Sequence, residues 1–331
     1  MLQAYRLGRK IGGTAHDRCA QPDSPLANVI VTSLTPSGMS GSGKGGKAFM
    51  PPFCREVRRQ GYATHFCTSI RQLERFVASS TPAIIIHVYG EDHYLITSPR
   101  MKRAESKAHL IFNKSEIGPI IADKQLSLEH FTQFGVPMPP APTEGIPTFS
   151  NDRLGTSTPV SVVDSPMEAD QNRYNRAMIN TVQTTEGTAY HTSVRLMCVA
   201  DRIIHIMVRA RPTDENNASV HSKDTPLDPK LLGFLQDKLV HPYIKQYQNI
   251  ARKMCDAIGP CFVAHDVLVD HQGGGVFVCE AGLKFFDNTL QRHLSPIGKD
   301  LPFHTVLFNE AEYGRFAGGQ FADYVTASVD F

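Results

Sequence analysis

The chain has 331 residues, of which 41% are hydrophobic and 20% charged, and its formal net charge is +2. This is the composition of an ordinary globular protein, long enough for two or three subdomains. No apolar run approaches the roughly 20 residues needed to span a bilayer. The seven cysteines form no C-x2-C pair. A membrane protein, a structural zinc site and a secreted disulfide framework are therefore all disfavoured.

The N-terminal stretch MLQAYRLGRKIGG lacks the apolar centre of a signal peptide, so we expect a cytoplasmic protein. The charge is unevenly distributed, with +8 over residues 1–124 and −6 over the remainder. The basic part is either a solvated face or a surface that meets an anionic ligand such as a carboxylate or phosphate. Nucleic acid is disfavoured as a partner because the basic residues are not interleaved with aromatic ones.

The N-terminal third alternates between strand and helix patterns. Short apolar runs at 28–34, 63–68 and 83–89 predict buried strands, and helical spacing occupies 51–60 and 70–79. This alternation predicts an α/β unit with a parallel sheet.

A glycine-rich stretch, GMSGSGKGGK (38–47), follows the first predicted strand. A phosphate-binding P-loop requires Ser or Thr directly after its Gly-Lys pair, because that hydroxyl binds magnesium. This chain has Gly45 in that position, so a P-loop kinase is disfavoured. The stretch is either a mobile loop over a ligand or a plain surface loop.

The rest of the chain predicts an α+β arrangement. A helix is expected from Asp123 to Phe134, and the proline-rich stretch 136–159 is a candidate subdomain boundary. Further predicted elements are a strand at 160–163, an antiparallel pair at 192–199 and 202–211 turning at Ala200-Asp201, a long helix over 228–257, and a hairpin built from CFVAHDVLVD, HQGGG and VFVCEAG (261–282).

The last hairpin carries two carboxylates. A turn centred near Gly273 would place Asp266 directly opposite Glu280, on one side of the sheet. Because the flanking residues are mostly apolar, two charged carboxylates there would repel each other and lose hydration. A divalent cation such as Mg²⁺ between them resolves the conflict. A partly solvated acidic pair and an acid/base dyad are the alternatives.

Three segments in this order resemble ATP-grasp ligases of the glutathione synthetase and ribosomal-protein glutamate ligase branch. They are GPIIADKQLSLEHFTQFGVPMPP (118–140), SVRLMCVADRIIHIMVRARP (193–212) and FVAHDVLVDHQGGGVFVCEAG (262–282). The resemblance covers roughly residues 110–290. It implies an ATP-grasp fold, in which two α+β subdomains clasp a nucleotide, preceded by an α/β domain. The implied domains are 1–110 for substrate binding, 111–195 as the small ATP-grasp subdomain and 196–331 as its C-terminal subdomain.

The resemblance implies an ATP-dependent carboxylate–amine ligase that uses ATP and Mg²⁺. Its carboxylate substrate would become an acyl phosphate, which a small amine then attacks to form an amide bond. Phosphoryl transfer of this kind depends on positioning and on neutralisation of charge. A homodimer is the default expectation.

Some site residues follow from the matched motifs, and the others from their place along the chain. Asp266 and Glu280 would hold Mg²⁺, while Arg195, Arg209 and Arg211 would contact ATP or the acyl phosphate. Arg209 and Arg211 share a face by strand alternation, a fork suited to oxyanions. Nucleotide contacts are expected from Lys124, Arg176 and, in a polar loop, His221 with Lys223. Lys44 and Lys47 of the glycine-rich loop would meet the anionic substrate at the carboxyl ends of the strands.

The sequence departs from the family in the segment 159–183. That segment has no lysine and no glycine cluster, where the family has a second lysine and a glycine-rich lid. Arg173 or Arg176 would have to supply the missing charge. Gly282 stands where an asparagine commonly provides a third metal ligand, so Asn288, Asp287 or water is expected there instead. A catalytically degenerate module that binds a nucleotide or metabolite is therefore the second interpretation.

Overall fold

The computed structural model describes residues 20–32, 46–67, 69–88, 99–154, 160–213, 219–221, 224–283 and 310–330. The chain forms two compact units. Unit 1 comprises residues 1–118, 258–263 and 283–331, and unit 2 comprises 119–257 and 264–282. The sequence did not indicate that segments so far apart would join unit 1. The three consecutive domains expected from the sequence, 1–110, 111–195 and 196–331, stay a prediction.

Unit 1 contains a parallel sheet in the order β2-β1-β3-β4. Its strands are β1 (Asn28–Thr32), β2 (Ala63–Cys67), β3 (Ala83–His87) and β4 (Leu110–Phe112). All five residues of β1 and of β3 are buried. Strands covered on both faces have near-continuous apolar sequences, which is why these runs could be recognised. The predicted α/β unit is confirmed.

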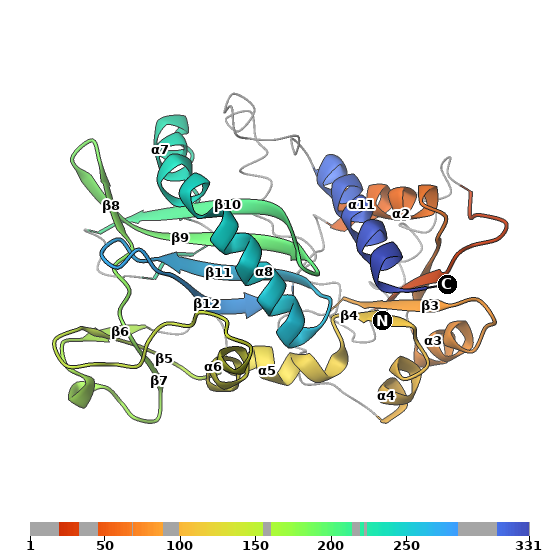
Figure 1. Cartoon of the computed structure of the whole chain (residues 1–331), viewed down its shortest axis with the longest axis horizontal. Coiled ribbons are helices and arrows are strands. Elements are labelled where there is room, and N and C mark those ends of the chain that lie inside the picture. Colours follow the sequence, from red (N-terminus) through yellow and green to blue (C-terminus); the bar gives the residue numbers. More distant parts are fainter. Residues whose placement is uncertain are drawn as a thin grey trace. The chain divides into compact units, whose positions relative to one another are not determined.

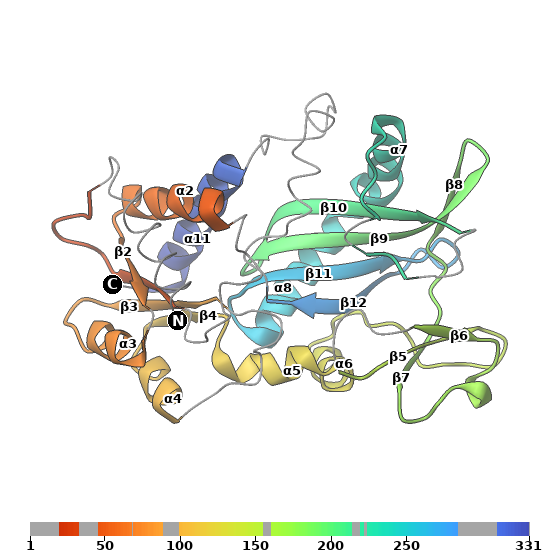
Figure 2. The ribbon, with the colours of Figure 1, turned by 180° about the vertical axis from the view of Figure 1, so that it is seen from behind.

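Helices cover both faces of this sheet (Figures 1 and 2). They are α2 (Gly46–Arg59) and α11 (Glu310–Ser328) on one face, and α3 (Ile70–Val77) and α4 (Pro99–Glu105) on the other. Ser69 caps α3 by accepting a hydrogen bond from the backbone N–H of Gln72. The C-terminal helix α11 was not predicted from the sequence.

Unit 2 is built on an antiparallel sheet in the order β10-β9-β11-β12, with β8 also paired to β9. Its strands are β8 (Val182–Thr185), β9 (Thr188–Val199), β10 (Arg202–Pro212), β11 (Phe262–Val269) and β12 (Val276–Gly282). Ala200, at the β9–β10 turn, has a φ of 53°. The predicted antiparallel pair and the C-terminal hairpin are both confirmed.

The long helix predicted over 228–257 is wrong as a single element. It is two helices, α7 (Pro229–Leu239) and α8 (Ile244–Ile258), separated by a 3₁₀ turn at His241–Tyr243. Pro242 explains the break, because proline lacks the N–H that an uninterrupted helix needs and its ring crowds the preceding turn. Helix α8 crosses one face of the unit 2 sheet (Figures 1 and 2).

A second, three-stranded sheet in unit 2 has the order β6-β5-β7. Its strands are β5 (Thr148–Asn151), β6 (Ser161–Val163) and β7 (Tyr174–Ala177). The strand predicted at 160–163 is confirmed, whereas β5, β7 and β8 were missed. Helices α5 (Gly118–Ala122) and α6 (Lys124–Gln133) precede this sheet, and α6 confirms the helix predicted from Asp123.

The chain is thus α+β with an α/β N-terminal unit, as predicted. Within its described part, the protein has no helix of the length and apolarity that a bilayer span requires.

Candidate functional site

Asp266 and Glu280 are directly opposed across β11 and β12, as the sequence predicted. The register reaches this pairing through an irregularity, because Val267 pairs with Val278 and Cys279 is the extra residue. Such a bulge inserts one residue into one strand of the ladder. Without it, Asp266 would face Cys279. The bulge therefore creates the acidic pair.

The two carboxylates have different surroundings. Glu280 is exposed, whereas the side chain of Asp266 is only 16% exposed. The expectation that both lose their hydration is therefore wrong for Glu280, which projects from a strand that is otherwise largely covered. Asp266 needs no cation for its charge to be balanced, since two arginines contact it.

Arg195, on the adjacent strand β9, and Arg209, on β10 one strand farther away, converge on Asp266. Arg195 Nε donates to Asp266 Oδ1 at 2.7 Å, and Arg195 Nη2 donates to Oδ2 at 2.8 Å. Arg209 Nη1 lies farther away, 3.3 Å from the same Oδ2. Arg195 is 7% exposed and Arg209 2%. A bidentate pair in such surroundings is strong because little water competes for its hydrogen bonds.

Arg211 lies two residues along β10 and has a different partner. Its Nη2 lies 3.0 Å from Oδ2 of Asp224, which also accepts a hydrogen bond from the backbone N–H of His221 at 2.6 Å. Across β9, Arg209 faces Ser193 and Arg211 faces His191. These side chains thus share one side of the sheet, which we call the basic face. Its residues are Arg195, Arg209, Arg211, Ser193 and Asp266.

Positive charge dominates the basic face. Burial, followed by the nearby Arg211, lowers the pKa of His191.

Among the described residues, Nε and Nη2 of Arg209 and Oγ of Ser193 are buried without a hydrogen-bond partner. Buried polar atoms nearly always have partners, so these atoms identify a place where an acceptor is lacking.

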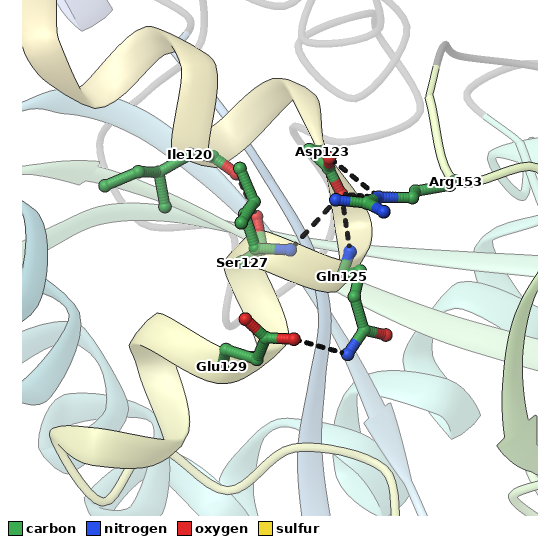
Figure 3. A network of polar contacts seen from close by, with 7 residues as sticks. Ile120, Asp123, Gln125, Ser127, Glu129 and Arg153 are labelled. Atoms are coloured by element: carbon green, nitrogen blue, oxygen red, sulfur yellow. Dashed lines mark hydrogen bonds and ion pairs between the residues drawn. The ribbon is translucent and has the colours of Figure 1, made fainter.

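Lys124 begins helix α6, at a position organised by its neighbours. The carboxylate of Asp123 accepts hydrogen bonds from the backbone N–H groups of Gln125 and Leu126 and caps the helix. Figure 3 shows Arg153 against the same carboxylate, with its Nε 2.7 Å from Oδ1. Lys124 itself is half-buried and donates its backbone N–H to the carbonyl of Arg153. Its contact with a nucleotide stays a prediction.

Arg176 lies on β7, in the three-stranded sheet, and not on the basic face. Its guanidinium stacks 5.4 Å from the ring centroid of Tyr174. Arg173, the alternative substitute for the missing lysine, is engaged by Asp152 at 3.1 Å and by Ser161 at 3.1 Å. Arg173 is thus paired with a carboxylate, whereas Arg176 has no carboxylate partner among the described residues, so Arg176 is the better candidate for a nucleotide contact.

Several predicted site residues cannot be placed. Lys44, Lys223, Asp287 and Asn288 lie outside the described residues. Lys47 falls in the first turn of α2, but its side chain is outside the described part. Their proposed roles stay predictions.

Two residues of the site escaped the sequence analysis, namely Ser193 and Asp224. Ser193 had a usable signal, because His191, Ser193 and Arg195 alternate with Thr192, Val194 and Leu196 along β9. A polar row of period two in an otherwise buried strand indicates a polar face. Asp224 had no such signal, since it lies in a loop whose path depends on tertiary contacts.

The donor set is compatible with a divalent cation. Asp266 and Glu280 offer opposed, hard oxygen ligands at the more exposed end of the basic face. Among the described residues, no group of three or more His, Cys, Asp and Glu side chains could hold a metal alone. Mg²⁺ is commonly held by one or two carboxylates together with substrate phosphates, so two protein ligands suffice.

Comparisons with known proteins find structural similarity and no sequence similarity. No protein-family model matches the chain, and no curated protein matches it. Solved structures that resemble it include N5-carboxyaminoimidazole ribonucleotide synthetase from Thermotoga maritima, with 13% identity and a TM-score of 0.46 over 89% of this chain and 76% of that one. A RimK domain protein ATP-grasp from Sphaerobacter thermophilus DSM 20745 has 13% identity and a TM-score of 0.43 over 90% and 99%. D-alanine–D-alanine ligase from Bacillus anthracis has 11% identity and a TM-score of 0.41 over 78% and 86%.

Solved ATP-grasp proteins are thus among the structures that this chain resembles. Identities and TM-scores this low do not assign an activity. The function has to be inferred from the chain's own residues.

Proposed function

We propose that this protein is an ATP-dependent carboxylate–amine ligase of the ATP-grasp type. The observation that supports this most is the basic face, where three buried arginines lie beside two directly opposed carboxylates. Phosphoryl transfer from ATP to a carboxylate brings several negatively charged oxygens together. A dry surface rich in guanidinium groups stabilises such charge far better than water does.

In this proposal the arginines have distinct roles. Arg209 binds an oxygen of the substrate carboxylate or of the transferred phosphoryl group. Arg195 holds Asp266 in position through its bidentate pair. Arg211, anchored by Asp224, supports the loop that carries His221 next to the site. The amine then attacks the acyl phosphate, and the new amide bond forms as phosphate leaves.

Asp266 and Glu280 would hold Mg²⁺. When bound, the ion neutralises phosphate charge and aligns the phosphoryl group for transfer. Lys124 and Arg176 are the proposed contacts to ATP outside the basic face. Lys44 and Lys47 are the proposed contacts to the anionic organic substrate.

The test is incubation with ATP, Mg²⁺ and a panel of amino acids, with ADP and phosphate release as the readout. ADP release that depends on an amino acid supports the ligase. Formation of AMP contradicts the acyl-phosphate route. Glu280→Ala should abolish turnover without unfolding the chain, whereas Glu168→Ala, at an exposed position away from the site, should retain it.

One observation favours a second candidate, a non-catalytic nucleotide- or metabolite-binding module. Asp266 accepts hydrogen bonds from two arginines, an arrangement that is stable without a metal ion. ATP binding in a calorimeter, with no turnover for any amino acid in the panel, would support this alternative over the ligase.

A further inference from the structure

The most buried part of the basic face contains polar atoms without hydrogen-bond partners among the described residues. Among the described residues, Arg209 makes one hydrogen bond, of 3.3 Å to Asp266, and its Nε and Nη2 have no hydrogen-bond partner. Ser193 lies directly opposite Arg209 across the strand pair, and its buried Oγ also has no partner there. Leaving such donors unpaired away from water is costly.

The atoms that lack partners are suited to one kind of ligand. Two N–H groups of one guanidinium, with the hydroxyl of the residue opposite on the adjacent strand, match the oxygens of a phosphate or carboxylate. The same ligand would meet little competition from solvent, because Arg209 is 2% exposed. Its Coulomb attraction to the guanidinium is correspondingly strong.

Asp266 is the neighbour affected by this site. Arg195 binds it through two short hydrogen bonds, but Arg209 binds it through one longer contact, so Arg209 is the partner that is more easily removed. Two guanidinium groups against one carboxylate oppose the approach of a divalent cation. Removal of one of them would reduce that repulsion.

We propose that Arg209 and Ser193 form an oxyanion-binding site, and that an oxyanion bound there draws Arg209 away from Asp266 and so permits a divalent cation to bind Asp266 and Glu280. The inference rests on the proposed function, from which it takes the metal carboxylates. Anion and cation then bind with positive coupling, which must be reciprocal. The site would load its cation only when an anionic substrate group is present.

The experiment is a titration of the full chain with Mn²⁺, with free Mn²⁺ measured by electron paramagnetic resonance. It is run in chloride alone, with inorganic phosphate and with acetate, each corrected by a protein-free blank. Phosphate or acetate should raise the affinity for Mn²⁺ at least tenfold. An effect of phosphate alone identifies a phosphoryl site, and an effect of acetate alone identifies a carboxylate site.

Variants assign the coupling to the two residues. Ser193→Ala, a small change, should reduce the anion effect severalfold. Arg209→Met should bind Mn²⁺ more tightly than wild type in chloride alone and should show no anion effect. Arg202→Met, at the far end of the same strand, is the matched control and should behave as wild type.

The outcomes that overturn the inference differ from those that overturn the ligase. Mn²⁺ binding that neither oxyanion changes rules out the coupling and leaves the ligase intact. An anion effect that survives in both Ser193→Ala and Arg209→Met also rules it out. If no Mn²⁺ binds under any condition, the coupling and the metal carboxylates are both wrong, and ADP release then decides the proposed function separately.

Discussion

Arg195 and Asp266 form a bidentate pair across β9 and β11, with donor–acceptor distances of 2.7 and 2.8 Å. The residues are 71 positions apart in sequence, and the pair joins the two halves of the unit 2 sheet. A planar guanidinium is required for this geometry, because an ammonium group cannot donate two parallel hydrogen bonds.

Arg195→Lys should therefore destabilise the protein although it preserves the charge. We expect the free energy of unfolding to fall by about 1–2 kcal/mol, since the bidentate bond is lost in a largely buried place. Urea denaturation measures the change. Arg202→Lys, at the β9–β10 turn, should change it by less than about 0.5 kcal/mol. Equal effects of the two substitutions would mean that the bidentate geometry contributes nothing.

The contact between α2 and α11 depends on glycine. A Cβ at Gly314 would collide with the carbonyl oxygen of Phe49, and one at Gly318 would lie 2.8 Å from that of Phe53. Since backbone atoms cannot move aside easily, Gly314→Ala should lower the free energy of unfolding by about 1–3 kcal/mol. Thermal denaturation followed by circular dichroism measures the loss.

Gly319 is the matched control for this prediction. Apart from its chain neighbours and the backbone of its own helix, no described atom lies within 4 Å of the position of its added Cβ. Gly319→Ala should stabilise the chain by about 0.5–1 kcal/mol, because alanine has the higher helix propensity. A loss of stability in both variants would mean that close packing at Gly314 is not the cause of its effect.

His265 should make the protein sensitive to mild acid. It is fully buried, and neither ring nitrogen has a hydrogen-bond partner within the described residues. Burial lowers its pKa to about 4, against a weaker opposite effect of Asp266. As the pH falls, His265 takes up a proton in the unfolded chain before it does so in the folded protein. The free energy of unfolding is therefore unaffected by His265 above about pH 6.5 and decreases between there and about pH 4, by up to about 3 kcal/mol.

His265→Leu should remove this decline. Urea denaturation at pH 7 and at pH 4.5 should give a smaller difference for the variant than for wild type. Parallel curves for the two proteins would mean that the ring is already protonated, or hydrated, in the folded state.

At lower pH, Glu105 should make the largest contribution to the pH dependence of stability. Burial alone would raise the pKa of its carboxyl, but hydrogen bonds from His87 and Ser115 outweigh burial and hold the pKa below 4.5. Since the folded pKa is depressed, the stability that Glu105 contributes is present above about pH 4.5 and is lost as the pH falls through the folded value.

Glu105→Gln tests that window. At pH 7 it should cost about 2 kcal/mol, because the buried contacts to His87, at 2.9 Å, and to Ser115, at 2.7 Å, are weakened. As the pH is lowered below 4.5, the free energy of unfolding of the Glu105→Gln variant should decrease less steeply than that of wild type. Denaturant titrations at intervals from pH 7 to pH 3 compare the slopes.

Much of the local structure could be predicted from the sequence. The buried strands β1 and β3 are continuous β-branched and apolar runs, and Asp123 marks the start of α6 as a capping residue. Pro242 equally indicates the break between α7 and α8, because proline interrupts a helix. Helix α11 also has a readable pattern, because its buried residues Tyr313, Ala317, Phe321 and Val325 recur every four positions. Its membership of unit 1, by contrast, depends on tertiary packing against α2.

The sequence by itself determined most of the strand and helix pattern and the alternation of Arg209 and Arg211, because residue spacing fixes which side chains share a face. Only the tertiary structure decided that a bulge at Cys279 makes the acidic pair and that Arg195 and Arg209 reach Asp266. Strands distant in the chain become neighbours only when the sheet forms. The charge that surrounds a carboxylate is a property of that assembled sheet, and no local pattern encodes it.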